Sequence, residues 1–234
     1  MRRKPLSNKT LIIFIATSIF GLLTTLTLAT AKPIVYDDYF WRKPLIGSLF
    51  SAICIAGIIA AFRPNKCSER FEPEKMQSLE LDRLPNQQIK GHHPDCGRFS
   101  DHTITFSKRV DCAACSGLAS GAFLAFLGAV FYFFGGNVSA ETGRPMLIAG
   151  SILVPLGLAQ LKSKGFVRLS LNVAFVCGAF LVLVGVDILA RNLTLDLYVI
   201  GLIGLWIWTR IILSEWDHAR ICRSCRQDCG LTKT

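Results

Sequence analysis

The sequence predicts an all-α membrane protein with about six transmembrane helices and a small Cys/His-rich loop, in which a short β-hairpin could form. Three observations lead to this fold class. The 234 residues are 51% hydrophobic and 18% charged, whereas soluble domains contain about 25% charged residues. The apolar residues form long uninterrupted runs, which a bilayer requires and a soluble core cannot use. The only long polar segment, residues 63–111, interrupts these runs once.

Each apolar run predicts one membrane-spanning helix. The first run could also be a secretory signal, because Ala29-Thr30-Ala31 matches a cleavage-site pattern, but its length favours a retained anchor. Aromatic residues mixed with charges follow it and predict a belt at the membrane interface. The six predicted spans are residues 11–31, 45–62, 116–135, 146–161, 166–190 and 194–213.

The spans divide the chain into four parts. Residues 1–62 form an N-terminal two-helix membrane hairpin, and residues 63–115 form a loop with a motif like a zinc knuckle. Residues 116–213 form a four-helix membrane bundle, and residues 214–234 form a cysteine-rich tail.

The distribution of positive charge predicts the orientation. Most of the 26 lysine and arginine residues fall in the N-terminal segment, the long loop, the link between the fourth and fifth spans, and the tail. Positively charged segments stay in the cytoplasm, so the sequence predicts a multi-pass protein of the cell membrane with both termini cytoplasmic. The net charge of +10 therefore marks a membrane face and not a nucleic-acid site. The expected partners are the lipid bilayer and other membrane-protein subunits.

The long loop contains a pattern typical of a zinc site. His93 and Cys96 are followed, after fifteen residues, by Cys112 and Cys115, which is the spacing of two ligand pairs around one ion. Residues 103–110 between the pairs are rich in β-branched and aromatic residues and predict the hairpin. The second pair begins a helix, where residues at i and i+3 share a face and the helix dipole favours thiolates.

Other residues could complete this site or form a second one. His102 is an alternative fourth ligand. The tail could bind a metal alone or join the loop, because the last predicted span returns the chain to the same face. Its spacing does not match an iron–sulfur motif, so zinc is the expected cofactor. The additional candidate ligands in the tail are His218, Cys222, Cys225 and Cys229.

The preferred hypothesis is a structural zinc in an accessory or interaction component of a membrane assembly. The ligand set is complete without a neighbouring general base, so no catalytic residue is assigned and an enzyme is not favoured. The alternative is a membrane thiol–disulfide oxidoreductase with Cys112 as the nucleophile and Cys115 as the resolving thiol. A transporter of small solutes or metals is the third hypothesis.

Two features inside the spans predict contacts between residues. Asp187 has Arg191 four residues later, which predicts an ion pair on one helix surface at the interface. Two pairs of closely spaced glycines, Gly117 with Gly121 and Gly201 with Gly204, predict close packing between helices.

One stretch resembles a known family. The segments Cys96-Gly97-Arg98-Phe99 and Cys112-Ala113-Ala114-Cys115-Ser116-Gly117 are similar to an uncharacterised prokaryotic family of multi-span membrane proteins. That family has a Cys-Ala-x-Cys-Thr/Ser-Gly motif at a helix start. The resemblance covers about residues 91–122, with Ala114 where the family usually has Arg and Ser116 where it has Thr. It implies a small multi-span protein with a cysteine motif, and nothing about a substrate.

Overall fold

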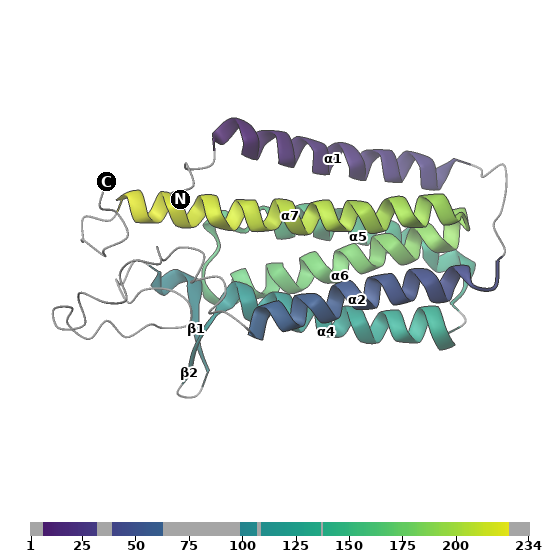
Figure 1. Ribbon diagram of the computed structural model, residues 1–234, viewed down its shortest axis with the longest axis horizontal. Helices are drawn as coiled ribbons and strands as arrows, with labels where there is room; N and C mark the ends of the chain where they lie inside the picture. The colour runs from purple at the N-terminus through teal and green to yellow at the C-terminus, as the bar shows by residue number, and fades with distance from the viewer. Residues whose placement is uncertain (1–6, 32–38, 63–98, 107–108, 137, 225–234) are drawn as a thin grey trace, which may run out of the picture.

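The computed structural model describes residues 7–31, 39–62, 99–106, 109–136 and 138–224. Within these residues, six long helices run alternately up and down an elongated bundle (Figure 1). The start of α4 and the end of α7 lie at one end, with the two strands, and we call this the hairpin end (Figure 1). The helices are α1 (Asn8–Thr30), α2 (Arg42–Phe62), α4 (Ala113–Val130), α5 (Gly143–Leu158), α6 (Gly165–Ala190) and α7 (Leu193–Ser224).

The helix lengths confirm a membrane protein. Among the described residues, five helices are long and apolar enough to cross a membrane: α1, α2, α6, α7, and α4 together with the π-helical turn η2 (Phe131–Gly135) that continues it. The fourth predicted span forms the shorter helix α5, which has 16 residues and contains Pro155 three residues before its end. Five of the six predicted spans therefore form helices long and apolar enough to cross a membrane.

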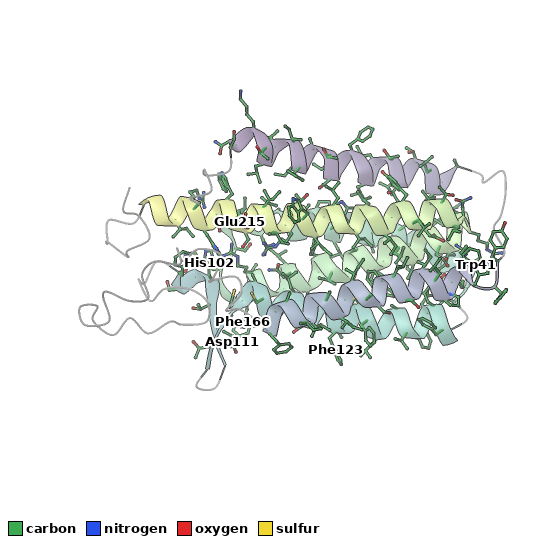
Figure 2. All side chains as sticks on the ribbon, in the orientation of Figure 1. Trp41, His102, Asp111, Phe123, Phe166 and Glu215 are labelled. Atoms are coloured by element: carbon green, nitrogen blue, oxygen red, sulfur yellow. The ribbon has the colours of Figure 1, made fainter. Side chains whose placement is uncertain are left out.

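The outer surface of the bundle is suited to lipid. Large apolar side chains are exposed along several helices, including Phe20, Phe123, Ile152 and Phe166. Phe123 and Phe166 lie on the surface of the bundle (Figure 2). A soluble monomer rarely exposes so much contiguous apolar surface, whereas lipid chains cover it in a bilayer.

The helices pack in layers. In Figure 1, α1 lies along α7, while α2 and α4 lie on the other side of α6. Glycines allow the closest approaches, and the predicted contacts of Gly117 and Gly121 are confirmed. A Cβ at Gly117 would lie 2.4 Å from the carbonyl oxygen of Leu169, and one at Gly121 would lie 3.0 Å from Cα of Val173, both on α6.

The second predicted glycine pair does not pack against another helix. A Cβ at Gly201 or Gly204 would meet no atom within 4 Å, because both residues lie on an exposed face of α7. This prediction was wrong because spacing identifies a helix face but not the rotation of that face toward a neighbour.

Polar contacts attach α1 to α7. The hydroxyls of Ser18 and Thr209 lie 2.9 Å apart, and the Trp206 indole N–H donates to the carbonyl oxygen of Ser18 at 3.3 Å. Near the hairpin end, the Trp216 indole N–H donates to Oδ1 of Asn8 at 3.0 Å. These contacts make α1 an integral part of the bundle.

The predicted hairpin is present. Strands β1 (Thr103–Phe106) and β2 (Arg109–Cys112) pair antiparallel, with Thr103 opposite Cys112. The 3-10 turn η1 (Ser100–His102) precedes β1, and α4 begins directly after β2. The hairpin therefore brings His102 and the first cysteine of the Cys-x-x-Cys pair to the same end of the bundle.

Candidate functional site

The cysteine pair lies where β2 becomes α4. Cys112 is the N-cap residue of α4 and is buried, while Cys115 lies in the first helical turn and is half-buried. The first turn of α4 has backbone N–H groups without helical partners, and these stabilise a thiolate. The predicted placement of this pair at a helix start is confirmed.

Two histidines from distant parts of the chain meet at the hairpin end. The ring centroids of His102 and His218 lie 5.7 Å apart, and the Phe99 ring makes edge contacts with both at 5.4 Å and 5.6 Å. This contact exists because α7 extends beyond the predicted end of the last span to Ser224. The beginning of the predicted tail is thus helical and packs beside the loop histidine (His102 is labelled in Figure 2).

Buried charges lie beside these groups. Arg168 of α6 donates from Nη2 to Oδ2 of Asp217 on α7 at 2.9 Å, and both side chains are almost completely buried. Nε2 of His102 lies 3.8 Å from the same carboxylate oxygen. The more exposed Arg220 binds the other oxygen of Asp217 at 3.0 Å. One carboxylate of α7 therefore connects η1 and α6.

A second buried arginine connects this cluster to the cysteines. Arg210, 5% exposed, donates from Nε to Oδ1 of Asn172 at 3.1 Å. Its guanidinium is within electrostatic reach of Cys112, Cys115 and Asp217. The neighbouring Arg168 has no hydrogen-bond partner for Nε and Nη1 in the described structure. Among the described residues, the interior at this end therefore contains two arginines for one aspartate, next to two thiols.

An amide pair extends the polar cluster into α5. Nδ2 of Asn172 donates to Oε1 of Gln160 at 2.5 Å and to the carbonyl oxygen of Arg168 at 2.6 Å. Nε2 of Gln160 donates to the carbonyl oxygen of Gly157 at 2.8 Å. Because both amides are buried, these bonds avoid the cost of leaving polar groups unpaired.

The structure brings together four of the predicted metal ligands at one end: Cys112, Cys115, His102 and His218. Within the described ranges, no three Cys, His, Asp or Glu side chains are close enough to hold a metal ion. The described ligands alone therefore do not form a site. The other predicted ligands, His93, Cys96, Cys225, Cys229 and the side chain of Cys222, lie outside the described residues.

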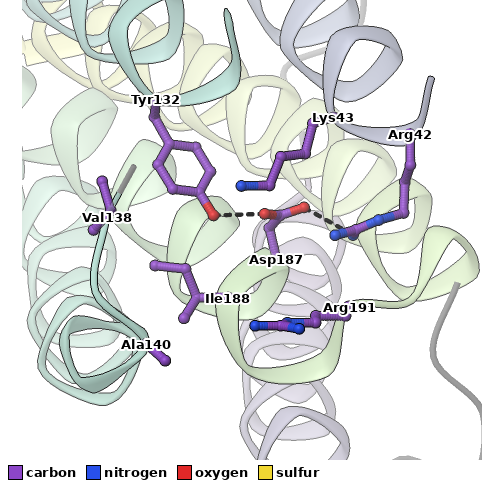
Figure 3. Close-up of a pocket in the computed structure, with 8 residues that line it drawn as sticks. All are labelled: Arg42, Lys43, Tyr132, Val138, Ala140, Asp187, Ile188 and Arg191. Carbon is purple, nitrogen blue, oxygen red and sulfur yellow. Dashed lines mark hydrogen bonds and ion pairs between the residues drawn. The ribbon is translucent and has the colours of Figure 1, made fainter. Parts of the chain in front are cut away.

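A separate charge cluster lies at the opposite end of the bundle, which we call the Arg42 end. Arg42, the first residue of α2, forms ion pairs with Asp187 of α6 at 2.8 Å and with Asp196 of α7. The Tyr132 hydroxyl donates to Oδ2 of Asp187 at 2.5 Å (Figure 3). All four side chains are buried. They join α2, η2, α6 and α7 where a pocket of about 230 Å³ opens.

The predicted Asp187–Arg191 ion pair is wrong. Asp187 pairs with Arg42, which is 145 positions earlier in the chain. The helix ends at Ala190, and Arg191 adopts a left-handed conformation with φ of 46°. Its side chain therefore leaves the face on which a residue four positions along a continuous helix would lie.

No family model, curated protein or solved structure matches this chain.

The resemblance of residues 91–122 to a prokaryotic membrane family therefore stays a prediction. The functional side chains that sequence reasoning missed are the interhelical charges, Arg42, Asp196, Arg168, Arg210 and Asp217. Each lies near a predicted span end, where a solvated interfacial charge is the ordinary expectation. Only the contacts between helices show which of these charges are buried and paired and which face solvent.

Proposed function

We propose that this chain is a six-span protein of the cell membrane, with both termini cytoplasmic, whose hairpin end binds a structural zinc ion. The proposed ligands are His93, Cys96, Cys112 and Cys115. The metal would fix the loop of residues 63–115 to the start of α4, and its binding free energy would contribute to folding. In this proposal the protein is an accessory or interaction component of a membrane assembly.

The shape of the bundle supports α5 as the sixth span. Its 16 residues correspond to about 24 Å of helix, against a hydrocarbon core of about 30 Å. The turn η4 (Gln160–Lys162) follows and adds length at the hairpin end. With α5 as a span, both chain termini and the positively charged loop lie on one side, which the positive-inside rule places in the cytoplasm.

One observation carries the zinc proposal: the surplus of buried positive charge beside the cysteines. Among the described residues, Arg168 and Arg210 face only Asp217 as a buried acid. An unbalanced charge at this depth is costly. A zinc ion bound by three thiolates and one neutral histidine carries one net negative charge, which would balance the surplus. Arginine donors next to thiolate ligands would also orient them.

Metal analysis of the purified full-length protein tests the proposal. We expect about one equivalent of zinc per chain and a loss of more than half of it after Cys112→Ser combined with Cys115→Ser. Cys177→Ser, which removes a thiol from the middle of α6, is the matched control and should retain the metal. Less than half an equivalent in the unmodified protein, or full retention in the double variant, would contradict the proposal.

The structure also gives one observation in favour of the thiol–disulfide alternative. Cys112 and Cys115 lie at a helix start beside Arg210, an environment that favours a nucleophilic thiolate. In that reaction Cys112 attacks a partner disulfide and releases one partner thiolate. Cys115 then displaces the second, leaving a Cys112–Cys115 disulfide and a reduced partner.

Alkylation of the native protein separates the two functions. Zinc-bound thiolates react slowly until a chelator removes the metal, after which both thiols become reactive. A redox pair reacts at once in the reduced protein and becomes unreactive after treatment with an oxidised dithiol. Fast alkylation that a chelator does not change would therefore favour the oxidoreductase.

A further inference from the structure

The pocket at the Arg42 end is lined by an unusual set of charged groups. Arg42, Lys43 and Arg191 contribute three cations to its wall, and Asp187 contributes one carboxylate. The ends of Arg42, Lys43 and Tyr132 converge around Asp187, while Arg191 lies on another side of the space (Figure 3). The pocket therefore has more positive than negative groups.

The single acid of the pocket wall is already engaged. One oxygen of Asp187 pairs with Arg42 at 2.8 Å, and the other accepts the Tyr132 hydroxyl at 2.5 Å. Asp196, behind the pocket wall, also pairs with Arg42. These contacts fix Arg42, whose side chain is 5% exposed. Arg42 and its two acids together carry one net negative charge, so Lys43 and Arg191 leave the pocket region with one net positive charge.

Two cations remain without a carboxylate. Among the described residues, neither Lys43 nor Arg191 forms an ion pair. The ammonium of Lys43 lies over the Tyr132 ring, 4.7 Å from its centroid, a contact that positions the cation without neutralising it. The unmatched groups of the pocket are thus a lysine and an arginine, which together attract an anion.

The size and position of the pocket identify the kind of anion. A volume of about 230 Å³ is below the roughly 300–1,000 Å³ of pockets for drug-sized ligands, so a small group fits. The pocket lies at the start of α2 next to exposed aromatic residues, with Tyr39 and Trp41 stacked at 5.3 Å. Such aromatics occupy the headgroup level of a bilayer, where phosphate is the abundant anion.

We propose that the pocket formed by Lys43, Arg191, Arg42 and Tyr132 binds a phosphate group, either of an anionic lipid headgroup or of free phosphate. Arginine and lysine are the side chains that bind phosphate oxygens most often. In a bilayer, Arg42 and its two acids form the fixed wall, and Lys43 and Arg191 bind the ligand. This site lies at the opposite end from the proposed zinc and does not depend on it.

The test uses the full chain in a non-ionic detergent, with two anionic probes and one probe without net charge measured by calorimetry. The probes are inorganic phosphate and a soluble short-chain phosphatidylglycerol, with short-chain phosphatidylcholine as the probe without net charge. We expect at least one anionic probe to bind. Lys43→Gln combined with Arg191→Gln should weaken that binding at least about tenfold, since a hydrogen bond to a charged group contributes about 1.5–3 kcal/mol.

Arg144→Gln is the matched control, because this exposed arginine lies in the first turn of α5 on the same side of the bundle but does not line the pocket. It should leave binding unchanged. Binding of the lipid alone identifies a headgroup site, and binding of inorganic phosphate identifies a site for the free anion. The proposal is overturned if the unmodified protein binds neither anionic probe. This outcome does not depend on whether any variant folds. It is also overturned if the double variant and Arg144→Gln bind equally.

Discussion

Arg42 connects three helices through one guanidinium. It extends from the first turn of α2 to Asp187 on α6 and Asp196 on α7. Removing a buried ion-pair partner is more damaging than the strength of the pair suggests, because the remaining charge stays buried without compensation. Here a substitution would leave two carboxylates facing each other in the bundle.

We therefore expect Arg42→Gln to reduce the free energy of unfolding by about 3–5 kcal/mol, the usual cost of breaking a buried pair. Denaturant titration of the purified protein in detergent measures this change. Arg144→Gln removes an exposed arginine on the same side and should change stability by less than about 0.5 kcal/mol. An equal effect of the two substitutions would show that the Arg42 ion pairs contribute nothing to stability.

At the hairpin end, Arg210 lies beside both cysteines and is held by Asn172. If these thiols bind zinc, Arg210→Gln should weaken zinc affinity by about 10–100-fold, as loss of a supporting group typically does. Competition with a coloured zinc chelator measures the affinity. Arg220→Gln is the control. The Arg220 side chain is 52% exposed and binds Asp217 from the outer side, so this substitution should weaken zinc affinity much less.

Helices α5 and α6 pack closely through regularly spaced glycines. Gly143, Gly150 and Gly157 recur every seven residues on α5, and Gly178 and Gly185 do so on α6. Without side chains at these positions, the two backbones come into direct contact. In a bilayer, where lipid removes the hydrophobic drive for helix association, such close van der Waals packing is a main source of stability.

Gly150→Ala tests this contact. The added methyl would lie 2.6 Å from the carbonyl oxygen of Gly178 and 2.7 Å from the backbone nitrogen of Val182, and backbone cannot move aside easily. We expect a loss of about 1–3 kcal/mol in unfolding free energy, read from the thermal unfolding of the protein in detergent. Gly201→Ala, where nothing lies within 4 Å, should be neutral or stabilising by up to about 1 kcal/mol.

Over the whole molecule, two polar clusters lie at opposite ends of the bundle with an apolar region between them. On α6, every buried residue between Asn172 and Asp187 is apolar or glycine. Trp206 of α7 and Phe50 of α2 are also fully buried, and the Phe50 ring lies 5.8 Å from the Phe180 ring of α6. The described core between the two clusters along α6 is therefore apolar.

The six-span topology is tested by cysteine labelling from outside intact cells. Ser139 precedes α5 at the Arg42 end and Ser163 follows it. If α5 crosses the membrane, Ser139→Cys should react with a membrane-impermeant maleimide and Ser163→Cys should react only after the cells are opened. Labelling of both residues in intact cells would place α5 on one side and contradict six spans.

The sequence predicted the local features of this protein. Long apolar runs gave the membrane class and the approximate helix bounds, since hydropathy acts on each segment separately. The hairpin and the helix start at Cys112 were also predicted, because strand propensity and turn signals are local. The ligand spacing around His93 and Cys96 stays a prediction, since those residues lie outside the described part of the chain.

The tertiary structure alone decided which distant groups meet. The sequence predicted that Asp187 pairs with its neighbour Arg191, whereas it pairs with Arg42. It predicted that Gly201 packs against a helix, whereas Gly201 faces open space. Composition and spacing determine that a segment enters the membrane as a helix. The rotation and depth of each helix depend on how all six pack together, and these set which charges are buried and paired.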